Sequence, residues 1–253
     1  MKQLLRALSD TLIEPSRGPR RLAALKQSFG DELNEAALRR VAVSHRYGIL
    51  YNRIQKNANS SLIAWFHRIE HGTTKSIIKS RRDMLHLDRV APGQVAKIAT
   101  YRRLIVIRNP YSRVLSAFLE KFRYDHIIAA HGRFERTPEG FGAFLDWVQN
   151  GGLTRNPHWD LQTKQIALPL SAYTDVIRFE TLAQDMTRFI ASIGNEALTE
   201  ASTGMFDQGR RHATGADTRQ SEYYTPARQQ QVAEIYRADF EVLGYEVDRV
   251  NLQ

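Results

Sequence analysis

The segment from Tyr47 to Ile69 changes its apolar period in the middle, and this change constrains the fold more than any other feature of the chain. Its first part, Gly48 to Ile54, is rich in residues that favour strands. In its second part, apolar residues recur at the spacing of one helix face: Leu62, Trp65, Phe66 and Ile69. The loop between them, QKNANSS, contains Lys56 and no glycine. A strand, a short polar loop and a helix in this order direct free backbone N–H groups and the positive helix end to one point, so we predict a phosphate or sulfate site there.

Two further short segments have the character of buried strands. Residues 104–107 (LIVI) form a fully apolar run, as expected of a strand covered on both faces by helices, and residues 175–179 (DVIRF) form a third strand. A helical pattern over residues 181–193 follows the third strand. Strands that alternate with helices indicate a parallel sheet with covered faces. The sequence therefore predicts an α/β fold, with a parallel sheet flanked by helices.

A strong helix start follows the second predicted strand directly. Arg108 ends the apolar run, Asn109 offers an N-cap, and Pro110 suits the first helical position. The helix carries a continuous apolar stripe: Tyr111, Val114, Leu115, Phe118, Leu119 and Phe122. Because Ser112 and Ser116 border this stripe, they can lie beside the core and still face a ligand.

The first 44 residues are interpreted as an appendage to the main domain. Residues 2–13 and 32–43 have the pattern of short amphipathic helices, and the breaker PSRGP at residues 15–19 separates them. The remaining length suffices for one substantial α/β core. We predict a helical appendage over residues 1–44 and a single sulfate- or phosphate-binding α/β domain over residues 45–253.

Two polar, basic segments are interpreted as loops. Residues 70–90 have no usable period and include His86, so we predict a loop that faces the active site. Residues 202–222 combine glycines with cationic side chains, which suggests a mobile basic loop. Threonine followed by proline, at residues 137–138 and again at 225–226, marks the start of two further helices.

The composition limits the possible binding partners and the cellular location of the protein. Lysine and arginine number 36 against 27 aspartate and glutamate, and the formal charge of +9 favours anionic partners without choosing among nucleotides, nucleic acid, acidic glycans and membrane surfaces. The absence of cysteine excludes disulfides and thiolate zinc sites. No apolar run approaches the ~20 residues that span a bilayer, and the N-terminus lacks the apolar core of a secretory signal. We therefore expect a soluble, cytoplasmic enzyme, and peripheral contact with a membrane stays open.

Two segments together resemble the nucleotide-binding motifs of sulfotransferases. QKNANSSL at residues 55–62 follows the pattern P-K-x-[GA]-x-[ST]-[ST] from its lysine onward, and RNPYSRVLSAF at residues 108–118 matches R-[DN]-P-x-x-R-x-x-S-[AY]-[FY]. Later segments that look like family landmarks are the pair at residues 158–159 (HW) and residues 178–182 (RFETL) and 239–245 (DFEVLGY). The chain most resembles the Golgi-type carbohydrate sulfotransferases, the group that contains chondroitin 4-O, HNK-1 and heparan sulfate 2-O enzymes.

This resemblance implies a P-loop NTPase-like sulfotransferase fold, 3′-phosphoadenosine-5′-phosphosulfate (PAPS) as donor, and a hydroxyl of a sugar or glycolipid as acceptor. It places Lys56 at the 5′-phosphosulfate, and Arg108 and Ser116 at the 3′-phosphate. It also places the N–H groups of the following residues around the 5′-phosphosulfate: Asn57, Ala58, Asn59, Ser60 and Ser61. Sulfuryl transfer, like phosphoryl transfer, needs donor and acceptor held in line and charge neutralised on the leaving phosphate, which a lysine can supply. We expect no metal cofactor.

A base must also take the proton of the acceptor hydroxyl. The resemblance favours His86, because heparan sulfate 2-O-type relatives carry a catalytic histidine in the segment that leads to the second strand; a structural loop histidine is the alternative interpretation. His158 is the second candidate, since the His-Trp pair resembles a family landmark, although it could serve only to order a turn. Arg210, Arg211 and Arg219 could close over the 3′-phosphate, bind an acidic glycan or lie in a solvated loop.

The chain departs from the family pattern at several points. Gln55 stands where proline is usual, Asn109 replaces the commoner aspartate, and the membrane anchor and cysteines of the animal enzymes are absent. A soluble, bacterial-type member of the family would account for all of these differences. They weaken inference about the acceptor more than inference about the donor.

Two other functions stay open. A nucleoside or sugar kinase of similar fold would fit the strand-loop-helix unit, but the chain lacks G-x-x-x-x-G-K-[ST] and a recognisable magnesium carboxylate. A protein that binds RNA or another polyanion would fit the charge of +9, but no recognisable nucleic-acid motif supports it, so we expect no nucleic-acid partner. The sequence leaves open which acceptor is used and which oligomeric state the protein adopts.

Overall fold

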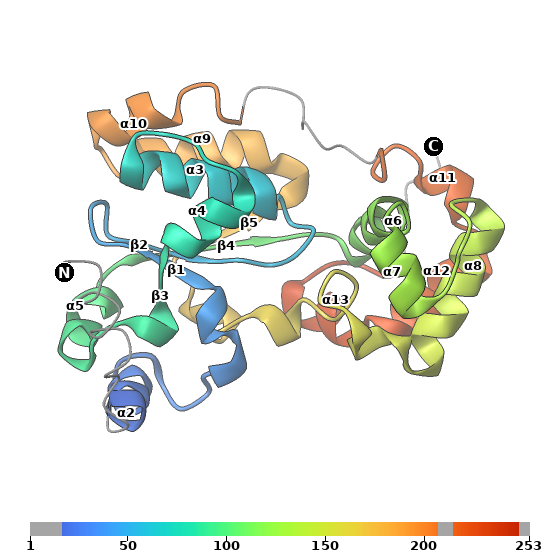
Figure 1. Ribbon diagram of the computed structural model, residues 1–253, viewed down its shortest axis with the longest axis horizontal. Helices are drawn as coiled ribbons and strands as arrows, with labels where there is room; N and C mark the ends of the chain where they lie inside the picture. The colour runs from blue at the N-terminus through green and yellow to red at the C-terminus, as the bar shows by residue number, and fades with distance from the viewer. Residues whose placement is uncertain (1–16, 207–214, 248–253) are drawn as a thin grey trace, which may run out of the picture.

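Figure 1 shows the computed structural model, which describes residues 17–206 and 215–247. Its strands form one sheet in the order β3-β1-β2-β4-β5. Their bounds are Val41–Ser44 (β1), Ile49–Asn52 (β2), Leu85–His86 (β3), Arg102–Ile107 (β4) and Asp175–Arg178 (β5). β2, β4 and β5 pair in parallel, whereas β1 pairs antiparallel with both β2 and β3. The predicted α/β class is confirmed, and the three strands expected from the sequence form the parallel part of a mixed sheet.

The two strands that pair antiparallel, β1 and β3, were not predicted from the sequence. The prediction of a helix over residues 32–43 is wrong: Glu35–Arg40 is a short 3-10 helix (η1), and the chain then enters β1. Val41 and Val43 are β-branched and buried, and β1 pairs with β2 along its whole length. Gly48, with φ of 63°, supplies the left-handed conformation at the end of the connecting turn.

Helices cover both faces of the sheet. Above the sheet in Figure 1 lie α3 (Asn59–His71), α9 (Leu182–Ser192) and α10 (Glu196–Ser202). Their apolar side chains share a core with Leu104 and Val106 of β4. On the other face α2 (Arg17–Phe29) and α5 (Val95–Ala99) share a core with Leu50 of β2. Successive residues of a strand point to opposite faces, so β2 contributes to both cores, with Tyr51 in the first and Leu50 in the second.

A helical half lies beyond the carboxyl end of β4 (Figure 1). It consists of α6 (Pro110–Lys121), α7 (Asp125–His131), α8 (Pro138–Trp147), α11 (Gln220–Tyr223), α12 (Pro226–Ile235) and α13 (Arg237–Leu243). Aromatic rings fill its core, among them Phe118 and Phe141 with centroids 5.2 Å apart. The interior of this half is therefore built on the apolar stripe of α6.

The three helix starts expected from the sequence are confirmed. The side chain of Asn109 accepts from Tyr111 N at 2.9 Å at the start of α6. Thr137 and Thr225 cap α8 and α12 in the same way, each accepting a backbone N–H from the first turn. In all three helices proline follows the cap, where its missing N–H removes no hydrogen bond.

Other local predictions need correction. The breaker expected over residues 15–19 is wrong for its described part, because α2 begins at Arg17 and accommodates Pro19 in its first turn, where proline is tolerated. Residues 70–90 are not a loop: they contain α4 (Ile77–Asp83), β3 and a 3-10 turn, η2 (Leu87–Arg89). The helix expected over residues 2–13 lies outside the described residues, as does part of the basic loop expected over residues 202–222.

The start of the sheet lies close to the predicted domain boundary. β1 ends at Ser44, directly before that boundary, and Leu25 of α2 is fully buried in the core that contains Leu50. The division into residues 1–44 and 45–253 stays a prediction.

Within residues 17–206 and 215–247, no helix has both the length and the apolar character needed to cross a membrane.

Candidate active site

The loop between β2 and α3 has a strained backbone. Lys56 and Ala58 have φ angles of 72° and 54°. Residues with a Cβ adopt this left-handed region at a cost of ~1–2 kcal/mol each. α3 begins at Asn59 with Ala58 as its N-cap residue, and no side chain caps it. The first turn therefore leaves backbone donors without intrahelical partners, and strain retained beside uncapped donors is typical of an anion site.

Two buried amides hold this loop against β4. Asn57 is fully buried, and its Nδ2 donates to Val106 O at 2.8 Å and to Gln162 Oε1 at 2.7 Å. Gln162 Oε1 also accepts from Arg108 N at 3.1 Å, while its Nε2 donates to Arg108 O at 2.8 Å. These contacts fix the loop after β2 relative to the carboxyl end of β4. The site is therefore held by two neighbouring parallel strands, β2 and β4.

The Lys56 ammonium forms an ion pair with Glu120, near the end of α6. Only 9% of the Lys56 side chain is exposed, and burial lowers its pKa to about 8, although Glu120 acts in the opposite direction. Burial alone raises the pKa of Glu120, but Lys56 and Lys121 outweigh it and lower the pKa to about 2. Both groups are thus charged at pH ~7, and the carboxylate orients the ammonium.

Arg108 follows β4 and is buried next to the same loop. Its Nη1 donates to Lys56 O at 3.0 Å, and its Nη2 forms an ion pair with Asp217 Oδ1 at 2.9 Å. Its Nε donates to Ser112 Oγ at 3.0 Å, and its guanidinium carbon lies 3.9 Å from the centroid of the Phe179 ring. These contacts give the guanidinium a fixed orientation beside Lys56.

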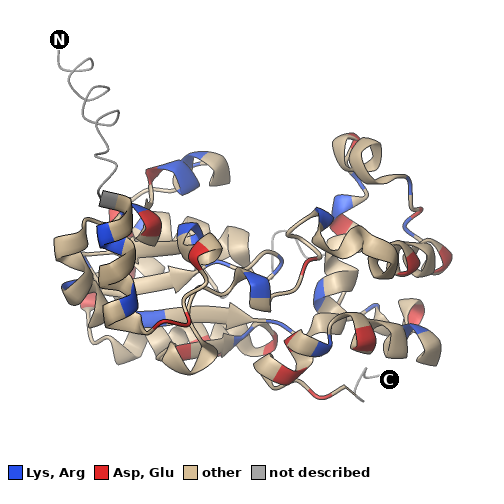
Figure 2. Cartoon of the chain, turned by 90° about the horizontal axis from the view of Figure 1, so that it is seen from below, with Lys and Arg blue, Asp and Glu red and all other residues tan. Residues whose placement is uncertain are grey.

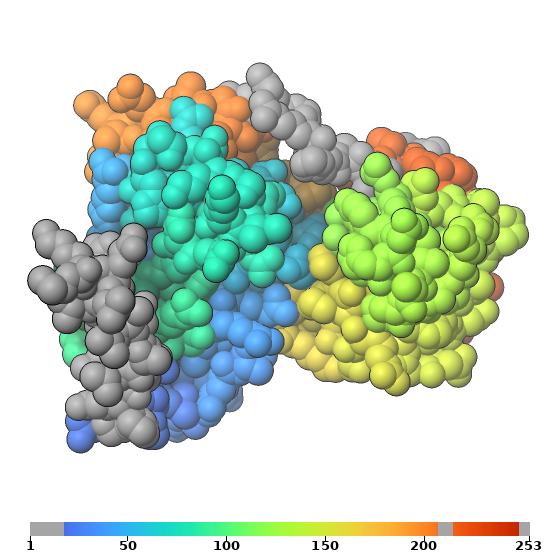
Figure 3. Space-filling model, in the orientation of Figure 1, coloured from blue at the N-terminus to red at the C-terminus, as the bar shows by residue number. Residues whose placement is uncertain are grey.

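A cavity of about 140 Å³, called the α3 cavity below, lies at this loop. In Figure 3 the surface is hollowed between the teal segment of α3 and α4 and the green segment of α6 to α8. The cavity is lined by Gln55, Lys56, Ala58, Asn59, Ser60, Ser61, Arg108, Ser116, Glu120, Lys121, His158, Phe179 and Leu182. Of the site residues predicted from the sequence, the structure brings all together here except Asn57, which lies buried beneath the loop, and His86.

His158 lines this cavity in a defined tautomer. Its Nδ1 lies 2.6 Å from Asn156 Oδ1, and the same oxygen accepts from the His158 backbone N–H at 3.1 Å. Because an amide oxygen only accepts, Nδ1 carries the proton and Nε2 keeps its lone pair. Burial, together with Lys121 and Lys56, lowers the pKa of His158 to about 3. The imidazole is therefore neutral at pH ~7 and can accept a proton on Nε2.

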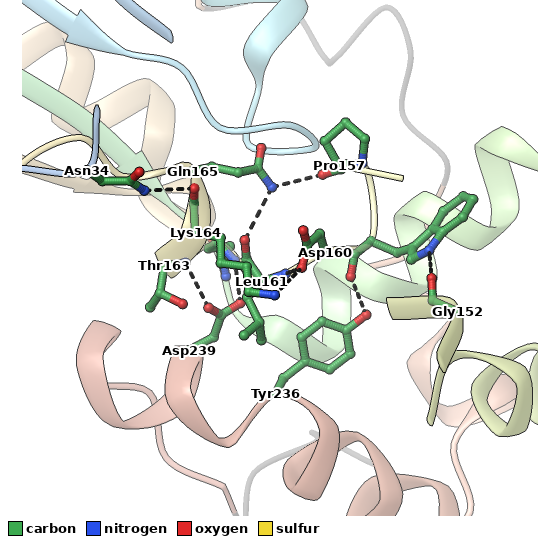
Figure 4. A network of polar contacts seen from close by, with 12 residues as sticks. Asn34, Gly152, Pro157, Asp160, Leu161, Thr163, Lys164, Gln165, Tyr236 and Asp239 are labelled. Carbon is green, nitrogen blue, oxygen red and sulfur yellow. Dashed lines mark hydrogen bonds and ion pairs between the residues drawn. The ribbon is translucent and has the colours of Figure 1, made fainter. Parts of the chain in front are cut away.

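Residues 157–165, which carry His158, are fixed by a polar network (Figure 4). Asp239 of α13 is fully buried and accepts two backbone N–H groups of this segment, at 2.8 and 3.0 Å. Tyr236 donates its hydroxyl to a carbonyl of the segment at 2.6 Å. Gln165 donates Nε2 to the carbonyl that precedes His158, at 2.8 Å. The candidate base is therefore held by a rigid frame.

Arg113, the second arginine of the motif at residues 108–118, serves this frame. Its side chain is 1% exposed and does not line the α3 cavity. The guanidinium donates to three backbone carbonyls: Gln55 O at 3.0 Å, Asp160 O at 2.8 Å and Pro157 O at 3.3 Å. It thereby joins the loop after β2 to the segment that carries His158.

His86 lies apart from the α3 cavity. It ends β3 at the edge of the sheet, opposite Ala42 of β1, and lines a larger cavity that shares Gln55 with the α3 cavity. Burial and nearby arginines lower the pKa of His86 to about 4, and its Nε2 is buried without a hydrogen-bond partner. His86, the first candidate base, therefore borders this larger cavity and not the α3 cavity.

The remaining predictions concern basic loop residues and metals. Arg219 pairs with Glu222 at 2.8 Å, packs on the Tyr223 ring and does not line the α3 cavity. Arg210 and Arg211 lie outside the described residues. Among the side chains that the structure describes, no cluster of His, Asp or Glu is arranged to hold a metal ion.

Sequence reasoning missed three contributors to the site: Glu120, Gln162 and Asp217. A signal for Glu120 was present, because it follows Ser116 by four residues on α6 and helical spacing places both on one face. Gln162 and Asp217 come from distant segments and reach Arg108 only through the tertiary fold. No local pattern marks them.

Comparison with known protein families gives a match over most of the chain. A family model described as the sulfotransferase family matches residues 39–246. This range begins before β1 and ends after α13, so it includes every strand of the sheet and the whole lining of the α3 cavity. No curated protein and no solved structure gives a significant match.

Proposed function

Because the chain belongs to the sulfotransferase family, we propose that it transfers the sulfuryl group of PAPS to a hydroxyl of a carbohydrate or glycolipid. The observation that carries this proposal is the α3 cavity, where Lys56 in a strained loop and Arg108 after β4 meet an uncapped helix start. The resemblance of the two motifs to those of Golgi-type carbohydrate sulfotransferases supports the choice of acceptor.

The residues of the α3 cavity fit the charged groups of PAPS. Lys56 and the N–H groups at the start of α3 suit the 5′-phosphosulfate, while Arg108 and Ser116 suit the 3′-phosphate. Pockets that enclose a whole ligand measure ~300–1,000 Å³. The α3 cavity, at about 140 Å³, therefore suits the charged groups and not the entire nucleotide.

PAPS, when bound, supplies the sulfuryl group, with adenosine 3′,5′-bisphosphate as leaving group. The chain contributes charge, position and a base. Lys56 holds a positive charge where the leaving phosphate gains negative charge, and burial strengthens that interaction. His158 accepts the proton of the acceptor hydroxyl on Nε2, while Asn156 keeps the ring oriented through Nδ1–H. Arg113 and Gln162 keep these groups in register.

We propose His158 as the base in preference to His86. His158 lines the same cavity as Lys56, whereas His86 borders the neighbouring cavity. His86 stays the second candidate, and rates separate the two. Removal of a general base costs ~10²–10⁴ in rate. Replacement of His158 by alanine should lower kcat by about this factor, and an equal loss for His86→Ala with His158→Ala active would reverse the assignment.

The donor proposal is tested by calorimetric titration of adenosine 3′,5′-bisphosphate, with AMP as the matched ligand that lacks the 3′-phosphate. We expect the wild type to bind the bisphosphate more tightly than AMP, and Arg108→Gln to remove most of this preference. Arg178→Gln is the control, because Arg178 ends the adjacent strand β5 opposite Ile107 and does not line the α3 cavity. Equal affinity of the wild type for both nucleotides would refute the donor assignment. Transfer of label from PAPS to glycans then tests the acceptor.

A further inference from the structure

A second, larger cavity adjoins the α3 cavity and is rich in arginine. It measures about 780 Å³, within the ~300–1,000 Å³ range of ligand pockets. The arginines in its wall are Arg39, Arg40, Arg53, Arg81, Arg82 and Arg89. They come from η1, the residue directly after β2, α4 and η2, so four separate parts of the chain converge on it. In Figure 2 several of the blue Lys and Arg segments lie where the sheet meets the helical half. We call this space the arginine cavity.

The arginine cavity has little negative charge of its own. Among the residues that the structure describes, Asp88 is the one carboxylate in its wall, against six guanidinium groups. Within residues 17–206 and 215–247, none of these guanidinium groups forms an ion pair with a carboxylate. Burial, Arg81 and Arg40 lower the pKa of Arg53 to about 10, and burial and neighbouring arginines lower that of Arg40. Like charges held this close repel each other, so an anion bound here would relieve an unfavourable field.

Polar atoms without partners lie in the same wall. Arg53 is 6% exposed, and its Nε has no hydrogen-bond partner, although its Nη2 donates to Arg39 O at 3.1 Å. His86 Nε2 and Asp88 Oδ1 are also buried without partners. Most buried polar atoms in folded proteins are paired, so three unpaired atoms in residues of one cavity wall leave hydrogen-bonding capacity unused there.

The position of the arginine cavity relates it to the reaction. Gln55 lines both cavities, and Pro157, directly before the candidate base His158, lines the arginine cavity. A molecule held by the arginines can therefore reach the boundary of the α3 cavity. Ile78 of α4 lines the same space with 71% of its surface exposed, and it offers an apolar contact to the uncharged part of such a molecule.

We propose that the arginine cavity is the acceptor site and that the acceptor carries an anionic group, a carboxylate or a phosphate, which Arg53 and Arg81 bind while a hydroxyl of the same molecule faces the α3 cavity. This inference rests on the proposed sulfotransferase function and narrows its substrate class. Guanidinium groups bind carboxylates and phosphates through paired hydrogen bonds, so both groups are compatible with the lining. His86 is neutral at pH ~7 and offers a hydrogen bond to the acceptor.

The test measures binding of three small probes by ligand-observed NMR: glucuronate, glucose 6-phosphate and glucose. Each is measured at fixed ionic strength, with and without saturating adenosine 3′,5′-bisphosphate. We expect both anions to bind alongside the bisphosphate and glucose to bind at least about tenfold more weakly, the loss expected when a charge-assisted hydrogen bond is removed. The stronger of the two anions identifies the group that the acceptor carries.

Matched variants on α4 localise the site. Arg81 is exposed and lines the arginine cavity, whereas Lys79 is exposed on the same helix and does not line it. Arg81→Gln should weaken binding of the anionic probes about tenfold, and Lys79→Gln should leave it unchanged. Arg53→Gln should weaken it further, since Arg53 is buried in the wall. None of the three substitutions should change the affinity for the bisphosphate.

Specific outcomes would overturn the inference. Anionic probes that bind no better than glucose, or that lose affinity equally in Arg81→Gln and Lys79→Gln, would show that the arginines form only a diffuse basic surface. Probes that compete with the bisphosphate would place the anions in the α3 cavity instead. Failure of the donor proposal is separate: the bisphosphate would then not bind, whatever the probes do.

Discussion

Arg113 offers a test of how the candidate site is held together. It belongs to a motif that resembles a phosphate-binding motif, so a direct contact with the nucleotide would be the simplest expectation. The structure gives it a different role, because its buried guanidinium donates to three backbone carbonyls on two segments, at 2.8 to 3.3 Å. We predict that Arg113→Met acts first on stability and on binding only as a consequence.

The magnitude follows from these contacts. Arg113→Met keeps an unbranched side chain and removes all three donors. A buried acceptor left without a partner costs ~1–3 kcal/mol. Removal of the buried guanidinium recovers part of this free energy, because burial disfavours its charge and lowers the pKa of Arg113. We expect a net loss of ~3–5 kcal/mol in the free energy of unfolding. For a chain of this size that corresponds to a fall of roughly 10 °C in Tm.

Arg113→Lys is the matched control, since it keeps the charge and loses the planar fork that reaches several carbonyls. Thermal unfolding followed by circular dichroism measures stability, and titration of adenosine 3′,5′-bisphosphate below the transition measures binding. We expect both variants to lose stability, Met more than Lys. The reasoning is refuted if Arg113→Met stays within ~1 kcal/mol of the wild type while its affinity for the bisphosphate falls and Lys restores it, because Arg113 would then bind the ligand directly.

Further predictions concern protonation. Affinity for the bisphosphate, measured by calorimetry, should fall as the pH rises through about 8, because Lys56 loses its proton there, and Lys56→Met should lack this dependence. Glu120→Gln should move that midpoint to lower pH, since Glu120 raises the pKa of Lys56. The acid limb of kcat/KM should lie well below pH ~6.5, because the pKa of His158 in the free protein is about 3 and the base must be unprotonated. An acid limb of kcat/KM near pH ~6.5, the ordinary pKa of histidine, would show that a residue other than His158 is the base.

Features with a local cause were predictable from the sequence. The N-caps Asn109, Thr137 and Thr225 act within one turn of their own helices, so residue type and spacing suffice to place them. The buried strand at residues 104–107 is apolar throughout because both of its faces are covered. Pairing with β2 decided the state of residues 41–44, and that contact overrode the helical period read there.

The same distinction applies to the site. Lys56 and Arg108 were found because each lies between a strand and the start of a helix, a pattern that the sequence contains. Gln162 could not be found in this way, since the three hydrogen bonds of its side chain join segments that are far apart in the chain. The arginine cavity was not predicted either, because its six arginines come from four parts of the chain that only the fold brings together.

The two cavities differ in how their positive charge is balanced. In the α3 cavity Glu120 pairs with Lys56 and Asp217 with Arg108, so a nucleotide that binds must exchange with carboxylates of the chain itself. A small anion that replaces one carboxylate gains little binding free energy, because one ion pair is exchanged for another. A ligand with anionic groups at both positions forms two such ion pairs but loses its translational freedom only once, so it binds more tightly. In the described part of the chain, the arginine cavity has only Asp88 against six guanidinium groups and needs no such exchange. The α3 cavity should therefore discriminate the bisphosphate from inorganic phosphate, while the arginine cavity should bind simple carboxylates and phosphates without requiring a second charge.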